Sequence, residues 1–283
     1  MPDALSARRK PITTAALTVA LALLAVACQN GSDDKGATPS ASKPPAPSSP
    51  PAPGFTPPGT PELVHAKMPG PHHEFSGPAL VERAVMDSVN DPSFIVAMDM
   101  RSKSNHTRGR ITISGSGDCE GRLFRGRDGT MEILRKDGQA YLRPDETMLR
   151  TPGKDGVPAY SQAEAALVKG KWIKVPKADA EGNAVFDLCD FKKLIHEGYD
   201  PDLRYERAGT FKIRGTRTAR VTAKDSSSQV TYYIAGNPSP RLWRVELSGP
   251  EGTGYLAVTD YHIPFFPQEP PAGQIVDLSQ QRS

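Results

Sequence analysis

The sequence predicts an α+β domain in which a large curved antiparallel β-sheet, a half-barrel, has a few helices covering its concave face. Three observations lead to this fold class. Apolar and polar residues alternate over residues 93–142 and again over 205–261, which is the period of a half-buried strand. Turn pairs such as Asp128-Gly129 and Asp137-Gly138 punctuate these regions, as in an antiparallel meander. Helical periodicity is confined to three modest segments.

The chain begins with an export signal. Residues 8–10 (Arg-Arg-Lys) precede an uncharged apolar run over residues 12–27 that ends in small residues. A basic segment, an apolar run and a small-residue cleavage site make a secretory signal peptide, and this run is shorter than the roughly 20 apolar residues of a membrane-spanning helix. We therefore expect residues 1–27 to be a cleaved lipoprotein signal peptide. The residues after the arginine pair do not fit a twin-arginine signal.

Cys28 follows the apolar run directly and is the predicted lipidation site. The stretch Leu24-Ala25-Val26-Ala27-Cys28 resembles a bacterial lipobox, although its leucine stands one residue earlier than usual. The alternative is an ordinary cleaved signal that happens to end near a cysteine. Acyl chains contribute about 0.8 kcal/mol per buried CH₂, and stable anchoring needs more than one chain. A diacylglycerol-modified, palmitoylated Cys28 would hold the protein on the extracytoplasmic face of the cell membrane.

We expect residues 28–73 to be a lipidated cysteine followed by a Pro/Ser-rich disordered tether. Ten of the 28 prolines fall between Pro39 and Pro61, mixed with Ser, Ala and Thr. Such a segment cannot bury enough apolar surface to offset the entropy of ordering it, so we expect it to be extended. With residues 273–283 interpreted as a C-terminal tail, residues 74–272 remain as a single domain.

Charge and cysteine content limit the possible partners. The formal net charge of +3 falls to about +1 without residues 1–27, which carry three basic residues and one aspartate. No basic surplus remains for nucleic acid. With Cys28 acylated, Cys119 and Cys189 remain as a pair 70 residues apart. Outside the cytoplasm such a pair favours a disulfide over a metal site or a nucleophile, with two buried free thiols as the alternative.

Three segments predict helices. Residues 77–90 have Pro78 in the first turn, an apolar stripe at three- and four-residue steps, and Asp91-Pro92 as a stop. Residues 161–169 and 186–196 have shorter helical patterns, and a strand is expected over residues 170–175 between them.

The apolar face of so large a sheet needs a cover. Three modest helices either fill the concave face or leave a cavity, and an apolar cavity suits lipid tails, which need burial and few polar contacts. One of the two tryptophans, Trp172 or Trp243, is a candidate for lining the mouth of such a cavity. The alternative is that both are ordinary core residues. A slip of one residue in strand register would turn every candidate to the other face. The candidate lining residues are Phe94, Val96, Met98, Ile111, Ile113, Tyr232, Trp243 and Val245.

The order of these features resembles a known family. A lipobox, a Pro-rich tether, a helix and a β-meander are followed by Gly170-Lys171-Trp172-Ile173, a further helix, the run from Tyr232 to Val245, and the ending Val258 to Pro264. This order is similar to that of the LppX/LprG-type lipoproteins of actinobacteria, whose fold is similar to the half-barrel of LolA carriers. The resemblance implies binding of a lipid or lipoglycan in an apolar cavity and its transfer between membrane and wall. The Cys119/Cys189 pair is not part of that pattern, and a bridge there would narrow the cavity.

Catalysis is not predicted. None of the six histidines lies in a recognisable nucleophile, metal or acid/base motif, and Gly115-Ser116-Gly117 lacks the residues of a nucleophile elbow. His72, His73 and Glu74 are interpreted as loop residues. We expect no metal, no cofactor and a monomer. The alternative to a carrier is a tethered envelope scaffold or regulatory sensor that acts through protein–protein contacts without a small-molecule ligand.

Overall fold

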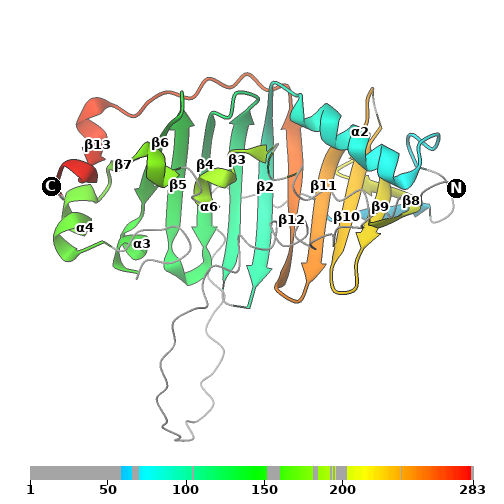
Figure 1. The fold of residues 1–283 in the computed structure, drawn as a ribbon, viewed down its shortest axis with the longest axis horizontal. Helices are drawn as coiled ribbons and strands as arrows, with labels where there is room; N and C mark the ends of the chain where they lie inside the picture. The colour runs from blue at the N-terminus through cyan, green and yellow to red at the C-terminus, as the bar shows by residue number, and fades with distance from the viewer. Residues whose placement is uncertain are drawn as a thin grey trace, which may run out of the picture.

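Thirteen strands form one open, curved sheet (Figure 1). A computed structural model describes residues 59–65, 70–103, 105–151, 160–180, 184–191, 193, 195, 203–236 and 238–281. The strand order is β1-β8-β9-β10-β11-β12-β2-β3-β4-β5-β6-β7-β13, and every pair is antiparallel except β13 with β7. The α+β half-barrel predicted from the sequence is confirmed, with one parallel strand added at its edge.

Two meanders make up most of the sheet. The first consists of β2 (Ser93–Ser102), β3 (His106–Ser114), β4 (Cys119–Arg125), β5 (Thr130–Lys136) and β6 (Gln139–Pro144). The second consists of β8 (Arg204–Ile213), β9 (Thr216–Lys224), β10 (Gln229–Ala235), β11 (Arg241–Gly249) and β12 (Gly252–Tyr261). Antiparallel pairing of β12 with β2 joins the two meanders in the middle of the sheet.

Two short strands lie outside the range predicted for the domain. β1 (Glu62–His65) pairs with β8, so the predicted tether over residues 28–73 contributes a strand. β13 (Ile275–Asp277) pairs with β7 (Trp172–Val175), so the predicted tail over residues 273–283 contributes another. Each short strand covers a sheet edge whose backbone groups would otherwise lack partners. The signal peptide, Cys28 and most of the predicted tether lie outside the described residues.

Three turn signals act as the sequence indicates. Asp137 and Gly138 join β5 to β6 with φ of 48° and 77°, the left-handed pair of a type I′ hairpin. Gly129, with φ of 109°, follows the short 3₁₀ helix η1 (Gly126–Asp128) and leads into β5. The Asp91-Pro92 pair separates the first helix from β2.

The predicted helices over residues 77–90 and 161–169 are confirmed. α2 (Gly77–Val89) has Ser76 as its N-cap, whose hydroxyl accepts a hydrogen bond from the Ala79 amide at 3.4 Å. α4 (Gln162–Val168) begins with a capping box formed by Ser161 and Glu164. The remaining helical segments are α3 (Glu146–Arg150), α5 (Lys177–Ala180), α6 (Ala184–Asp187), η2 (Ala272–Gln274) and η3 (Leu278–Gln281).

The third predicted helix, over residues 186–196, differs from the structure. α6 begins at Ala184 and ends at Asp187, and Leu188 and Cys189 form a turn. The Asp190 carboxylate then accepts a hydrogen bond from the Lys193 amide at 3.0 Å, which is how an N-cap starts a new helical turn. The interruption places Cys189 over the sheet.

The predicted disulfide is confirmed. Cys119, the first residue of β4, is bonded to Cys189, with the two Cα atoms 5.6 Å apart and both residues fully buried. The bond ties the segment after α6 to the sheet. α2 contacts β8, β10 and β11, and α6 contacts β5. We call the face of the sheet that these two segments cover the inner face, and the opposite face the outer face.

Candidate ligand-binding surfaces

Seven of the eight predicted lining residues lie on the inner face. Each is at most 6% exposed, and all belong to one apolar cluster that includes α2 residues such as Leu80 and the covering residues Phe186 and Phe191. The alternation of apolar and polar residues therefore predicted correctly which side chains of these strands point inward. That these side chains line a ligand cavity stays a prediction. The seven are Phe94, Val96, Met98, Ile111, Ile113, Tyr232 and Val245.

Trp243 is placed differently from the sequence expectation. A β-bulge interrupts the pairing of β10 with β11 after Tyr233, so that Ile234 lies opposite Leu242 and Leu242 is fully buried in the inner cluster. Trp243 is half-buried and packs against a separate cluster that contains Phe211 and Tyr233. The extra residue of a bulge breaks the period of two, and the adjacent Leu-Trp pair does not reveal which residue points inward.

A buried hydrogen-bond network holds α2 on the inner face. The Ser88 hydroxyl accepts a hydrogen bond from the Leu242 amide at 2.9 Å, and the Tyr261 hydroxyl lies 3.1 Å from the same oxygen. Burial raises the pKa of Tyr261 well above its usual value. Tyr261 therefore stays neutral at physiological pH, and its hydroxyl joins α2 to β11 and β12.

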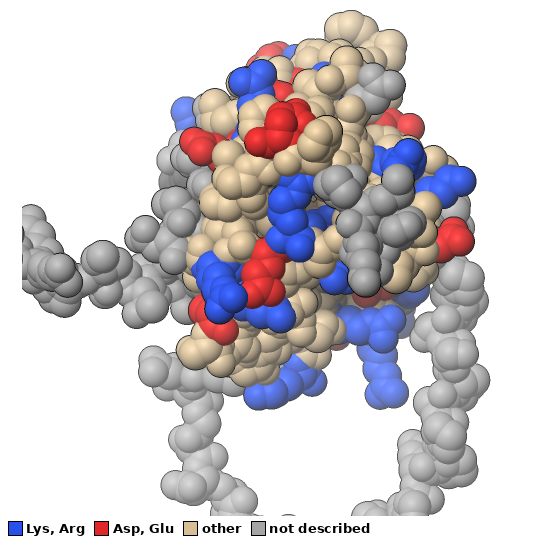
Figure 2. All heavy atoms as spheres, turned by 90° about the vertical axis from the view of Figure 1, so that its right-hand side faces the viewer, with Lys and Arg blue, Asp and Glu red and all other residues tan. Residues whose placement is uncertain are grey.

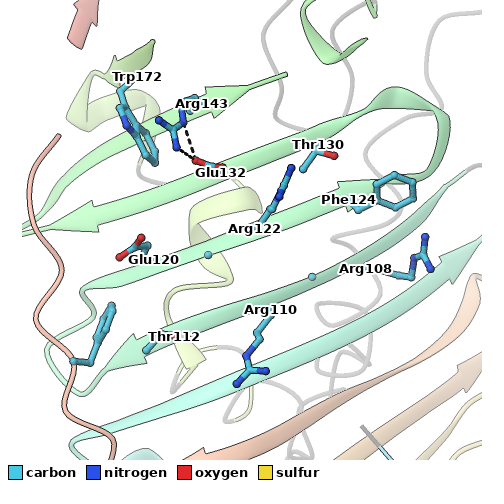
Figure 3. Close-up of a pocket in the computed structure, with 13 residues that line it drawn as sticks. Arg108, Arg110, Thr112, Glu120, Arg122, Phe124, Thr130, Glu132, Arg143 and Trp172 are labelled. Carbon is cyan, nitrogen blue, oxygen red and sulfur yellow. Dashed lines mark hydrogen bonds and ion pairs between the residues drawn. The ribbon is translucent and has the colours of Figure 1, made fainter. Parts of the chain in front are cut away.

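The outer face carries a hollow of about 630 Å³ over β3 to β7. Figure 3 views this face and shows the polar side chains that rise from the strands. Successive strand residues point to opposite faces, so these side chains lie on the reverse of the apolar cluster. We call it the arginine hollow, because its lining includes Arg108, Arg110, Arg122 and Arg143. Two glutamates also line it, Glu120 and Glu132, so these six side chains carry a net charge of +2.

Aromatic rings support two of the four arginines. The Arg108 guanidinium lies 4.7 Å from the centre of the Phe124 ring, and that of Arg143 lies 4.6 Å from the centre of the Trp172 ring. Arg143 Nε also donates a hydrogen bond to Glu132 at 2.7 Å. The Nε of Arg108 is buried and has no acceptor within the described structure.

The other two arginines are neighbours across the strands. Arg110 on β3 lies directly opposite Arg122 on β4. Arg110 is 3.6 Å from Asp260, whereas the Arg122 guanidinium makes no hydrogen bond or ion pair with any residue that the structure describes. In Figure 3 the two side chains point away from one another, Arg110 toward β2 and Arg122 toward β5. Sequence reasoning missed this cluster. The four arginines lie on three different strands, β3, β4 and β6, and only the strand register brings them together.

A second hollow, of about 400 Å³, lies beside the disulfide. Arg135 donates a hydrogen bond to the Gly117 carbonyl at 2.6 Å. Burial lowers the pKa of Arg135, and the carboxylates of Asp190, Asp118 and Asp187 oppose that shift. Charges here are balanced within the site, which favours a structural role for Asp187 and Asp190.

Charge elsewhere is mixed. Figure 2 shows the end of the molecule nearest β8, where acidic and basic side chains are interspersed. No group of three or more potential metal ligands occurs in the described ranges. Among the residues that the structure places, no helix combines the length and the apolar character needed to cross a bilayer. His72 and His73 lie 3.5 and 3.8 Å from Glu74 in a loop before α2.

Comparison with known proteins finds similar folds among solved structures. Neither the family models nor the curated proteins contain a match to this sequence. The lipoprotein LppX of Mycobacterium tuberculosis is 14% identical with a TM-score of 0.42, covering 68% of this chain and 99% of that one. LprF of Mycobacterium bovis is 13% identical with a TM-score of 0.47, covering 71% and 99%. The MucA/MucB complex of Pseudomonas aeruginosa is 9% identical with a TM-score of 0.34, covering 68% and 59%.

Two of these structures, LppX and LprF, belong to the lipoprotein group that the sequence resembles. At such identities and TM-scores the likeness concerns the fold alone. The function is therefore argued from the two faces of the sheet.

Proposed function

We propose that the protein is a membrane-anchored extracytoplasmic lipoprotein that binds or carries a lipid, lipoglycan or other hydrophobic ligand on the inner face of its sheet. One observation carries the proposal: a single apolar cluster extends across the inner face from Val221 on β9 to Leu142 on β6. Burying acyl chains there yields about 0.8 kcal/mol per CH₂. The surface needs few polar groups to hold such a ligand.

The cover of this face consists of separate pieces. α2 lies over the strands of the second meander, and the segment tied down by Cys189 lies over the first. The pieces approach the middle of the sheet where the Phe94 ring lies 4.6 Å from the Phe191 ring and 6.2 Å from the Tyr261 ring. We propose that a ligand enters along this seam, because Phe94 and Phe191 meet there through apolar rings that can part with the disulfide intact.

Lipid analysis tests the inner-face site. Residues 59–283, which keep β1 and omit the anchor, would be purified, extracted and examined by lipid mass spectrometry, and then tested for uptake of a fluorescent lipid. We expect a co-purified lipid and saturable uptake. Met98→Gln, on the inner face, should weaken uptake, whereas Asp99→Asn, its neighbour on the outer face, should not. Protein that is free of lipid and takes up no probe would contradict the proposal.

The anchor is tested at Cys28. Acylation predicts a mature N-terminal peptide that begins at a diacylglyceryl-modified, palmitoylated Cys28, detectable by mass spectrometry of the membrane fraction. Cys28→Ser should release the protein from that fraction. A mature terminus without acyl chains would contradict membrane anchoring.

A scaffold or regulatory sensor is the second candidate function, and a specific observation favours it. The seven inner-face residues are almost fully buried against the helices and against each other, as in a filled core. Crosslinking on living cells separates the two functions, because a scaffold predicts one dominant protein partner and no co-purified lipid.

A further inference from the structure

We propose that the arginine hollow on the outer face binds the phosphate group of a phosphorylated sugar or polyol. The site lies on the opposite face of the sheet from the proposed lipid site and uses different residues. It therefore stands or falls independently of the proposed function.

The charge of Arg122 is not compensated by any described residue. Cβ atoms of directly opposite strand residues lie about 5 Å apart, and like charges at such positions are destabilising. Arg110 and Arg122 occupy such a pair. Glu132, opposite Arg122 on the other side, is engaged by Arg143, and the described ion pair of Asp260 is with Arg110. Local violations of this kind in natural proteins are concentrated at functional sites.

Two of the four arginines are preorganised for binding. Stacking on Phe124 and Trp172 restricts Arg108 and Arg143 before any ligand arrives, so less side-chain entropy is lost on binding. The Nε of Arg108 is buried and has no acceptor among the described residues, so its charge is not compensated by a hydrogen bond at that atom. Guanidinium groups match the oxygen geometry of phosphate and bind it with charge-assisted hydrogen bonds.

The hollow has room and polar partners for more than a phosphate group. A volume of about 630 Å³ exceeds the needs of one phosphate and falls in the range of small-molecule sites, roughly 300–1,000 Å³. Glu120 and Glu132 can accept hydrogen bonds from hydroxyl groups, and Thr112 and Thr130 can donate or accept them. Guanidinium groups already stack on Phe124 and Trp172, while Phe265 is the third aromatic residue of the lining, so the hollow offers a phosphate site, partners for hydroxyls and one ring for the apolar face of a sugar.

Isothermal titration calorimetry tests the site. The full-length chain in phosphatidylcholine nanodiscs would be titrated with glucose 6-phosphate, inorganic phosphate and glucose. We expect glucose 6-phosphate to bind most tightly. Arg122→Gln should weaken this binding at least tenfold, about 1.4 kcal/mol. Arg217→Gln removes the same charge from an exposed position on β9 outside the hollow and should leave the affinity unchanged.

The remaining arms identify the source of the phosphate. If the natural source is a lipid headgroup, phosphatidylglycerol in the nanodisc should compete with glucose 6-phosphate for the wild-type protein and not for Arg122→Gln. If the source is soluble, the change of lipid has no effect. Equal losses in Arg122→Gln and Arg217→Gln, inorganic phosphate binding as tightly as glucose 6-phosphate, or no binding of either phosphate would overturn the proposal.

Discussion

Strand β3 presents two different chemistries to the two sides of the sheet. Ile111 and Ile113 point to the inner face, where each is at most 2% exposed, while Arg110 and Thr112 line the hollow on the outer face. Inner-face side chains contact one another and the helices, so truncating them removes packing. The outer-face arginines include a like-charge pair that packing does not require. Residues next to each other in the sequence can therefore contribute separately to stability and to recognition.

The outer face is itself divided. On the second meander Arg244 donates a hydrogen bond to Glu246 at 2.7 Å and lies 3.8 Å from the Tyr255 ring centre, and Tyr233 bonds the same glutamate at 3.2 Å. On the first meander Arg122 has no such partner among the described residues. Arg244 is thus paired with a carboxylate, whereas Arg122 is not paired with any described residue.

The largest expected effect concerns the disulfide that fastens the inner-face cover. A bond that closes a 70-residue loop contributes about 4 kcal/mol in the chain-entropy model. Replacing both cysteines, Cys119→Ala with Cys189→Ala, should lower the free energy of unfolding by about that amount in urea titrations. Hydrogen exchange should rise first in the segment after α6. A loss below about 1 kcal/mol would mean that the inner-face contacts hold the cover unaided.

Neighbouring truncations on β3 test the two faces directly. Ile111→Ala should cost about 2–4 kcal/mol, because it leaves a cavity in the inner cluster. Thr112→Ala, one residue further on the outer face, should change the stability by less than about 0.5 kcal/mol. Thermal or urea unfolding of the two variants measures the difference. Similar costs at the two positions would contradict the separation of the faces.

Alkaline pH should weaken the attachment of α2. Burial raises the pKa of Tyr233 to about 12 and that of Tyr261 further, so the folded state keeps protons that the unfolded chain releases near pH 10. The stabilisation is full below pH 10 and is lost as the pH rises through the folded-state pKa values. Above pH 10 the free energy of unfolding should fall less steeply with pH in Tyr261→Phe than in the wild type, by up to about 1.4 kcal/mol per pH unit in urea titrations.

The matched control for this slope is Ser88→Ala. It removes a hydrogen-bond partner of the tyrosine hydroxyl and leaves Tyr261 able to titrate. Its unfolding curves should keep the alkaline slope. Equal slopes for wild type and Tyr261→Phe would show that another group causes the alkaline loss.

Removing one arginine of the opposed pair should change the stability least. Arg122→Gln removes one member of the like-charge pair and should leave the free energy of unfolding unchanged or raise it by up to about 0.5 kcal/mol. Glu132→Gln breaks the contact with Arg143 and should lower the free energy of unfolding slightly. Urea titrations at low salt, where surface charges are least screened, resolve the difference. Marked destabilisation by Arg122→Gln would give Arg122 a structural role instead.

Local patterns predicted much of the fold. The alternation that places Phe94, Val96 and Met98 on one face is an intrinsic property of a strand and survives into the structure. Asp137-Gly138 encodes its hairpin through the left-handed backbone that glycine and aspartate tolerate. Elements without such a signal were not predicted. β1 and β13 are too short to show an alternation of apolar and polar residues, and the bulge beside Trp243 interrupts the alternation of β11.

Most of the strands, their apolar face and two of the helices could be predicted from local patterns, and the spacing of Cys119 and Cys189 favoured their disulfide. The packed sheet was needed to show that β12 lies beside β2 and that Arg108, Arg110, Arg122 and Arg143 surround one hollow. The physical reason is range. Periodicity and turn chemistry act over a few residues, whereas a site shared by several strands depends on registers that are set when the whole sheet packs.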